Sequence, residues 1–189
     1  SCQIAELSSW ETWGALRFGR RQGTRTIMPV FETQDVELYY EHDGAGPPAL
    51  LVAGLSSDVA SWEPVRKAFA ARFHLVMPDN RGAGRTRAKN GLGGLSIETM
   101  ADDIVQLTDH LGLESCLVVG HSMGAAIALE AATRRPRLAA RLVLAGAGLA
   151  NPRADAAVAS LRDLNARLGG GADWYRALFP WLFKPAFFK

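Results

Sequence analysis

Short apolar runs alternate with amphipathic stretches along the chain between residues 30 and 145. Alternating apolar and polar positions at 30–33 and 36–42 predict the two strands of a hairpin. Four later apolar runs predict further strands, at 49–53, 73–77, 115–119 and 140–145. The first of these four is wholly apolar, so we expect a strand that is covered on both faces.

Helical patterns fill the intervals between the later runs. Residues 62–71 and 123–133 have helical character, and apolar positions within 100–111 recur at helical spacing after a start at Ser96. A flexible segment is expected at 88–95. Strands that alternate with helices predict an α/β protein with a mostly parallel sheet flanked by helices.

Ligands of such sheets bind at the carboxyl ends of the strands. Three segments follow strands at this expected edge: 54–55, 79–84 and the turn at Ser122. Ser122 is the centre of a G-x-S-x-G pattern between a strand and a helix, an elbow in which a strained backbone lifts the serine hydroxyl clear of the sheet. We expect Gly120 and Gly124 to be required because side chains there would collide where strand and helix cross.

The composition excludes several classes of protein. A chain of 189 residues is long enough for one domain with a sizeable core. Its formal net charge of +2 gives no reason to expect a nucleic-acid or membrane partner, and no apolar run approaches the roughly 18 residues that span a bilayer. Two cysteines provide neither a disulfide framework nor a metal site, and Cys116 is expected to be a small core hydrophobe. We expect a cytoplasmic protein.

The two ends of the chain differ from this central part. Residues 1–27 carry tryptophans and arginines without a helical or strand period, and we interpret them as an atypical extension that need not be native. The α/β core is expected at 28–150. The aromatic segment at 151–189 is typical of the beginning of a helical cap, in which Trp181 and Phe183 either line a pocket or pack within the cap.

Three motifs, taken in order, resemble the α/β-hydrolase superfamily. They are Ala53-Gly54-Leu55 after the third strand, D-x-R-G-x-G at 79–84 after the fourth, and G-x-S-x-G at 120–124. The resemblance covers 30–189 and is greatest to cap-bearing serine esterases and lactonases such as the 3-oxoadipate enol-lactonases. Serine at the elbow argues against haloalkane dehalogenases and epoxide hydrolases, which use aspartate there. The resemblance implies an α/β-hydrolase fold.

This resemblance assigns a nucleophile and an oxyanion hole. Ser122 would be the nucleophile, activated by a base that takes its proton. The backbone N–H groups of Leu55 and Met123 would hold the tetrahedral oxyanion, and the loss of one such donor costs roughly 2.7–4 kcal/mol of transition-state stabilisation. No metal and no organic cofactor is implied.

Other residues near these motifs are expected to have supporting roles. His121, Ser56 and Trp62 are candidates for substrate binding because they adjoin the elbow and the oxyanion loop. Asp79 is expected to organise its own loop by accepting hydrogen bonds from backbone N–H groups, rather than to act as the catalytic acid.

The resemblance also implies a histidine base and an acid that both follow the serine in the chain. The four histidines are His42, His74, His110 and His121, and none of them follows Ser122. We therefore expect that the sequence stops before the C-terminal strands that carry the acid and the histidine. The alternative is a second chain that completes the sheet.

The predicted function is hydrolysis of a small carboxylic ester or lactone through an acyl-serine intermediate, with little activity in this chain alone. One alternative is different chemistry on the same fold, by a cofactor-free haloperoxidase or perhydrolase or by a C–C bond hydrolase. A non-catalytic binding protein is the other. The sequence specifies neither the substrate nor the oligomeric state.

Overall fold

The structure, a computed structural model, describes residues 29–91 and 94–147. The extension expected at 1–27 and the cap expected at 151–189 lie outside the described residues, together with Trp181 and Phe183. The boundaries proposed for these two segments stay predictions.

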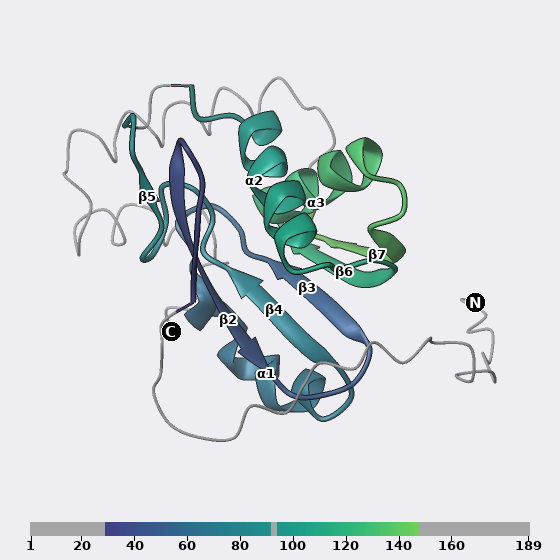
Figure 1. The fold of residues 1–189 in the computed structure, drawn as a ribbon. Helices are drawn as coiled ribbons and strands as arrows, with labels where there is room; N and C mark the ends of the chain where they lie inside the picture. Colours follow the sequence, from purple (N-terminus) through teal and green to yellow (C-terminus); the bar gives the residue numbers. More distant parts are fainter. Residues whose placement is uncertain (1–28, 92–93, 148–189) are drawn as a thin grey trace. The chain divides into compact units, whose positions relative to one another are not determined.

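A mixed sheet runs through the described part of the chain (Figure 1). In spatial order its strands are β1 (Val30–Glu32), β2 (Val36–Asp43), β4 (His74–Pro78), β3 (Pro48–Val52), β6 (Cys116–His121) and β7 (Ala139–Ala145). Pairing is antiparallel from β1 to β2 and from β2 to β4, and parallel from β4 through β3 and β6 to β7. The predicted hairpin and the predicted mostly parallel sheet are both confirmed.

A short strand, β5 (Arg87–Ala88), lies off this path and pairs with the start of β2. Ala88 was expected to open a flexible segment, and this start is wrong. The pairing continues into Lys89, whose N–H donates to the Asp35 carbonyl at 2.9 Å and whose ammonium contacts the Glu32 carboxylate at 2.6 Å. The sequence pattern missed β5 because two residues are too few to show a period.

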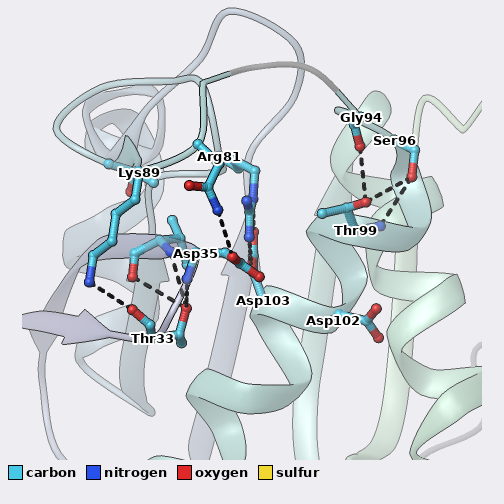
Figure 2. Close-up of polar contacts among 12 residues, drawn as sticks. Thr33, Asp35, Arg81, Lys89, Gly94, Ser96, Thr99, Asp102 and Asp103 are labelled. Carbon is cyan, nitrogen blue, oxygen red and sulfur yellow. Dashed lines mark hydrogen bonds and ion pairs between the residues drawn. The ribbon is translucent and has the colours of Figure 1, made fainter.

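Helices cover both faces of the sheet, with α2 (Ile97–His110) and α3 (Met123–Arg134) on one face and α1 (Glu63–Ala70) on the other (Figure 1). Ser96 caps α2 by accepting the Thr99 N–H at 3.1 Å, a contact shown in Figure 2. The helix predicted at 62–71 is confirmed as α1, within one residue at each end, and a 3-10 turn that was not predicted, η1 (Val59–Trp62), precedes it. Within the described ranges no helix is both long and apolar enough to cross a membrane.

Each face of the sheet buries its own apolar cluster. In β3, Leu50 and Val52 enter the cluster beneath α2 and α3, while Ala49 and Leu51 enter the cluster on the α1 side. This alternation explains why the strand is wholly apolar and confirms that both of its faces are covered. Cys116 belongs to the first cluster, and burial raises the pKa of its thiol to about 11, as suits a core residue.

Candidate active site

Ser122 forms the turn between β6 and α3. Its backbone has φ 54° and ψ −122°, a conformation that non-glycine residues rarely adopt. Two hydrogen bonds hold the turn: the Ser122 N–H donates to the Ala145 carbonyl of β7 at 2.8 Å, and the Ala125 N–H donates to the Ser122 carbonyl at 2.9 Å. The side chain is exposed, so the strained turn presents the hydroxyl to solvent, as the elbow pattern predicted.

The two glycines of the elbow have different neighbours. A Cβ at Gly120 would lie 2.4 Å from the Gly124 carbonyl oxygen and 2.6 Å from the Ala125 Cα, where strand and helix cross. A Cβ at Gly124 would lie 2.2 Å from the carbonyl oxygen of Val52 and 2.4 Å from that of Ala53. Both positions therefore exclude side chains as predicted, but Gly124 is constrained by the neighbouring strand β3 and not by the strand-helix crossing.

The loop after β3 lies directly against the elbow. A Cβ at Gly54 would be 3.2 Å from both the Ser122 Cβ and the His121 carbonyl oxygen. Within the part of the chain that the structure describes, no hydrogen bond occupies the backbone N–H of Leu55 or that of Met123. The fold therefore brings the Gly54–Leu55 loop and the start of α3 together at Ser122, with two unbonded donors.

The three residues predicted to bind substrate lie in different surroundings. His121 is exposed, and its imidazole lies beside the loop glycines: its Nδ1 is 3.5 Å from a Cβ at Gly54, and its Nε2 is 3.9 Å from one at Gly146. Ser56 is partly buried in the loop after β3, with φ 56°. Trp62 packs against the apolar cluster on the α1 side. Their roles in substrate binding stay predictions.

Asp79 organises the loop that follows β4. It is fully buried, and its two carboxylate oxygens accept the Val59 N–H and the Arg85 N–H, each at 2.8 Å. Gly84 has φ 53° and approaches this carboxylate so closely that a Cβ would lie 2.1 Å from Oδ2. This arrangement agrees with the structural role expected for Asp79, because both oxygens are already used by the backbone.

Two neighbours of Asp79 make contacts that sequence reasoning missed. Asn80 donates through Nδ2 to the Ala53 carbonyl at 2.7 Å, which links the loop after β4 to the loop after β3. Arg81 forms two hydrogen bonds to Asp103 of α2, at 2.7 and 2.8 Å, shown in Figure 2. These two hydrogen bonds are the main reason why the pKa of Arg81 is raised. The D-x-R-G-x-G pattern indicated a loop here but gave no signal of these partners.

The histidines other than His121 lie away from the elbow. His42 and His74 stack with ring centroids 5.2 Å apart, His74 being at the opening end of β4, and His110 stacks on Phe31 at 4.7 Å. Burial lowers the pKa of both members of the stacked pair. Among the described residues the Ser122 side chain has no hydrogen-bond partner. No group of three or more potential metal ligands occurs within 29–91 and 94–147.

The fold and the elbow are typical of one class of protein, and comparison with known sequences identifies that class. The sequence model of the alpha/beta hydrolase fold family matches residues 47–185, and the chain belongs to this family. It is 38% identical over 109 residues to a protein of Azorhizobium caulinodans named "Putative carbamate hydrolase RutD", a match that covers 58% of this chain and 40% of that protein. A protein of the same name from Agrobacterium fabrum is 39% identical over 111 residues, covering 59% of this chain and 42% of the relative. The chain therefore spans about two fifths of the length of the curated relatives it matches.

Solved structures show the same fold. Est816, described as an N-acyl homoserine lactone degrading enzyme, matches with a TM-score of 0.62 and 27% identity over 78% of this chain and 60% of its own. The N-acyl homoserine lactonase AidH matches with a TM-score of 0.58 and 26% identity, covering 63% of this chain and 44% of its own. Each is a protein that this chain resembles.

Proposed function

We propose that the protein is a serine hydrolase that cleaves a small carboxylic ester or lactone through an acyl-serine intermediate. The observation that carries the proposal is the elbow itself: an exposed serine in a strained turn, packed against the Gly54–Leu55 loop, with no hydrogen bond among the described residues to the backbone N–H of Leu55 or of Met123. Two other serines of the described chain have a positive φ: Ser56, at 56°, is partly buried in the loop after β3, and Ser115, at 53°, precedes β6 at the opposite end from the elbow.

The chemistry follows from these groups. The Ser122 oxygen attacks the substrate carbonyl carbon while a base takes its proton, and the carbonyl oxygen becomes an oxyanion held by the Leu55 and Met123 N–H groups. As the intermediate collapses, the base gives this proton to the departing oxygen, which expels the alcohol or opens the lactone ring and leaves an acyl-serine. The base then takes a proton from a water that attacks the acyl carbon, and it returns that proton to the Ser122 oxygen as the carboxylic acid leaves. No step requires a metal or an organic cofactor.

The base and its acid are proposed to come from residues outside these 189. His42, His74 and His110 lie away from the elbow, and each carboxylate oxygen of the buried Asp79 already accepts a backbone N–H. His121 is next to Ser122 in the chain, but its ring lies beside Gly54 and Gly146 and makes no hydrogen bond to the serine among the described residues. The 189-residue chain alone is therefore expected to turn over p-nitrophenyl acetate at the background rate.

A fluorophosphonate probe tests the proposal because it phosphonylates an activated serine. We expect the full-length protein to be labelled at Ser122, and labelling to vanish in Ser122→Ala. Ser115→Ala is the matched control: it removes another serine of positive φ, at the other end of β6, and leaves labelling intact. A folded full-length protein without labelling would overturn the proposal. Robust turnover by the 189-residue chain would instead show that this chain contains the base, with His121 the first candidate.

Carbamate hydrolysis is a second candidate, favoured by the similarity to the two proteins named for that activity. A carbamate carbonyl would use the same nucleophile and the same oxyanion donors. Parallel assays with a short p-nitrophenyl ester, an N-acyl homoserine lactone and a simple carbamate would rank the three substrate classes by kcat/KM. Turnover of each should disappear in Ser122→Ala.

A further inference from the structure

We infer that Asn80 is a positioning residue whose side-chain amide holds the loop that presents the Leu55 N–H. The inference deepens the proposed function and rests on it. Asn80 is the second residue of the D-x-R-G-x-G loop and only 2% exposed. Its Nδ2 donates to the Ala53 carbonyl at 2.7 Å, a contact between segments 27 residues apart.

The Ala53 carbonyl depends on this bond. Ala53 follows the last residue of β3 and is 1% exposed, so water does not replace a lost donor readily. Both ladders of β3 stop before Ala53, at Leu50 opposite Val76 on the β4 side and at Val52 opposite Gly120 on the β6 side. Within the described residues Asn80 is the sole donor to the Ala53 oxygen, and Gly124 of α3 is packed closely against the same oxygen.

Two linked peptide planes connect that oxygen to the Leu55 N–H. The Ala53 carbonyl shares a planar peptide with the Gly54 N–H, and the Gly54 carbonyl shares the next one with the Leu55 N–H. Because Gly54 lies between these two peptide planes and has no side chain, the planes can rotate easily relative to each other. The second plane is held by the Ser57 N–H, which donates to the Gly54 carbonyl at 3.3 Å. The first plane is held by Asn80, so both bonds are needed to aim the Leu55 N–H.

The other end of the Asn80 amide supports this role. Its Oδ1 is buried and has no hydrogen-bond partner among the described residues. Buried polar atoms in folded proteins are nearly always paired, and leucine would fill a similar volume without an unpaired acceptor. Packing alone therefore does not account for asparagine here, whereas the Nδ2 donor to the Ala53 carbonyl does.

The test compares Asn80→Leu and Asn80→Asp with the unsubstituted full-length protein. Neither replacement can donate to the Ala53 carbonyl. Since misplacement of a transition-state donor slows chemistry more than it weakens substrate binding, we expect kcat for a short p-nitrophenyl ester to fall about 10- to 100-fold. KM should stay within about threefold. Asn90→Leu is the matched control, because its amide donates to Asp35 at 2.9 Å in an exposed position, and its kinetics should be unchanged.

A second readout does not depend on activity. Residual dipolar couplings from NMR report the direction of the Leu55 N–H bond, and urea unfolding reports stability. We expect the Leu55 coupling to change in Asn80→Leu while remote amides keep theirs. Asn80→Leu leaves the buried Ala53 carbonyl unpaired but removes the unpaired Oδ1, so the two costs offset and the unfolding midpoint should stay near that of the unsubstituted protein. If Asn80 had only a structural role, Asn80→Leu would shift the unfolding midpoint, and the Leu55 coupling and the ratio of kcat to KM would not change.

The outcomes separate this inference from the proposed function. If activity requires Ser122 but Asn80→Leu keeps kcat within twofold, the positioning role is overturned and the hydrolase stands. If no activity requires Ser122, the hydrolase proposal fails, and the Leu55 coupling alone decides the structural part. An unchanged coupling in Asn80→Leu overturns the inference in either case.

Discussion

Replacing Gly124 with alanine adds one methyl group where the first turn of α3 meets the end of β3. The new Cβ would lie 2.2 Å from the Val52 oxygen and 2.4 Å from the Ala53 oxygen. Carbon and carbonyl oxygen in close contact are normally about 3.3–3.6 Å apart. The overlap is therefore about 1 Å against two backbone atoms of one strand, which cannot move aside by rotating a side chain.

The size of the effect follows from two opposing terms. Alanine is favoured over glycine in a helix by about 1 kcal/mol, and Gly124 has ordinary helical geometry, so propensity favours the variant. Overpacking typically costs about 1–3 kcal/mol, and displaced backbone lies at or above the upper end of that range. We expect a net loss of about 2 kcal/mol, which lowers the melting temperature by roughly 4–8 °C for a domain of this size.

Thermal melts followed by circular dichroism measure this loss, with Gly112→Ala as the matched control. Gly112 has φ 63° and open space around a Cβ, so its replacement costs only the left-handed backbone penalty of about 1–2 kcal/mol. Only Gly124→Ala should also slow fluorophosphonate labelling, because it pushes the Ala53 carbonyl away from the elbow. A melting temperature for Gly124→Ala equal to that of the unsubstituted protein would refute the steric reasoning.

Three further predictions concern the framework of the site. Asp79→Asn leaves one backbone N–H facing an amide group, and the free energy of unfolding in urea should fall by about 2–3 kcal/mol; an unchanged value would contradict the two-acceptor role. Arg81→Met leaves the buried Asp103 carboxylate without its partner and should lower the free energy of unfolding by about 3–5 kcal/mol. The double variant Arg81→Met/Asp103→Leu should recover most of this stability, and a double variant no more stable than the single one would argue against the ion pair. Burial holds the pKa of His42 and His74 below 6.5, so the unfolded chain takes up protons first as the pH falls. Stability should therefore decline from about pH 6.5 downward, and His42→Asn should flatten the decline measured by urea unfolding between pH 7.5 and 5.5; an equal slope in the variant would exclude this source.

Much of the fold could be predicted because its strands and helices carry strong periods. The apolar run at 49–53 gave β3 within one residue at each end, and Ser96 marked the start of α2. The order of strands in the sheet could not be predicted in the same way. β3 lies between β4 and β6 because the connections between these strands cross over the sheet. Several strands could pair with the same edge, and the local pattern of apolar residues does not indicate which of them does.

The elbow was visible in the sequence because its chemistry needs a fixed spacing of glycines around serine. The contacts that support it were not visible, since each joins distant segments through a single side chain. Asn80 reaching Ala53 is one example. Another is Arg85, which stacks 3.7 Å from the centroid of the Tyr39 ring and donates to Glu41 at 2.9 Å. Side chains of this kind can choose among many partners until the backbone is in place.

The hydrogen bond from the Ser122 N–H to Ala145 also has a consequence for synthesis of the protein. The ribosome makes the elbow before it makes β7, whose carbonyl holds the serine amide. At about 5–20 residues per second, the partner is added roughly 1–5 s after the serine. Until then the Ser122 backbone lacks this hydrogen bond, so in the nascent chain Ser122 should adopt a relaxed conformation. The strained geometry of Ser122 would then form only after β7 has been synthesised and has joined the sheet.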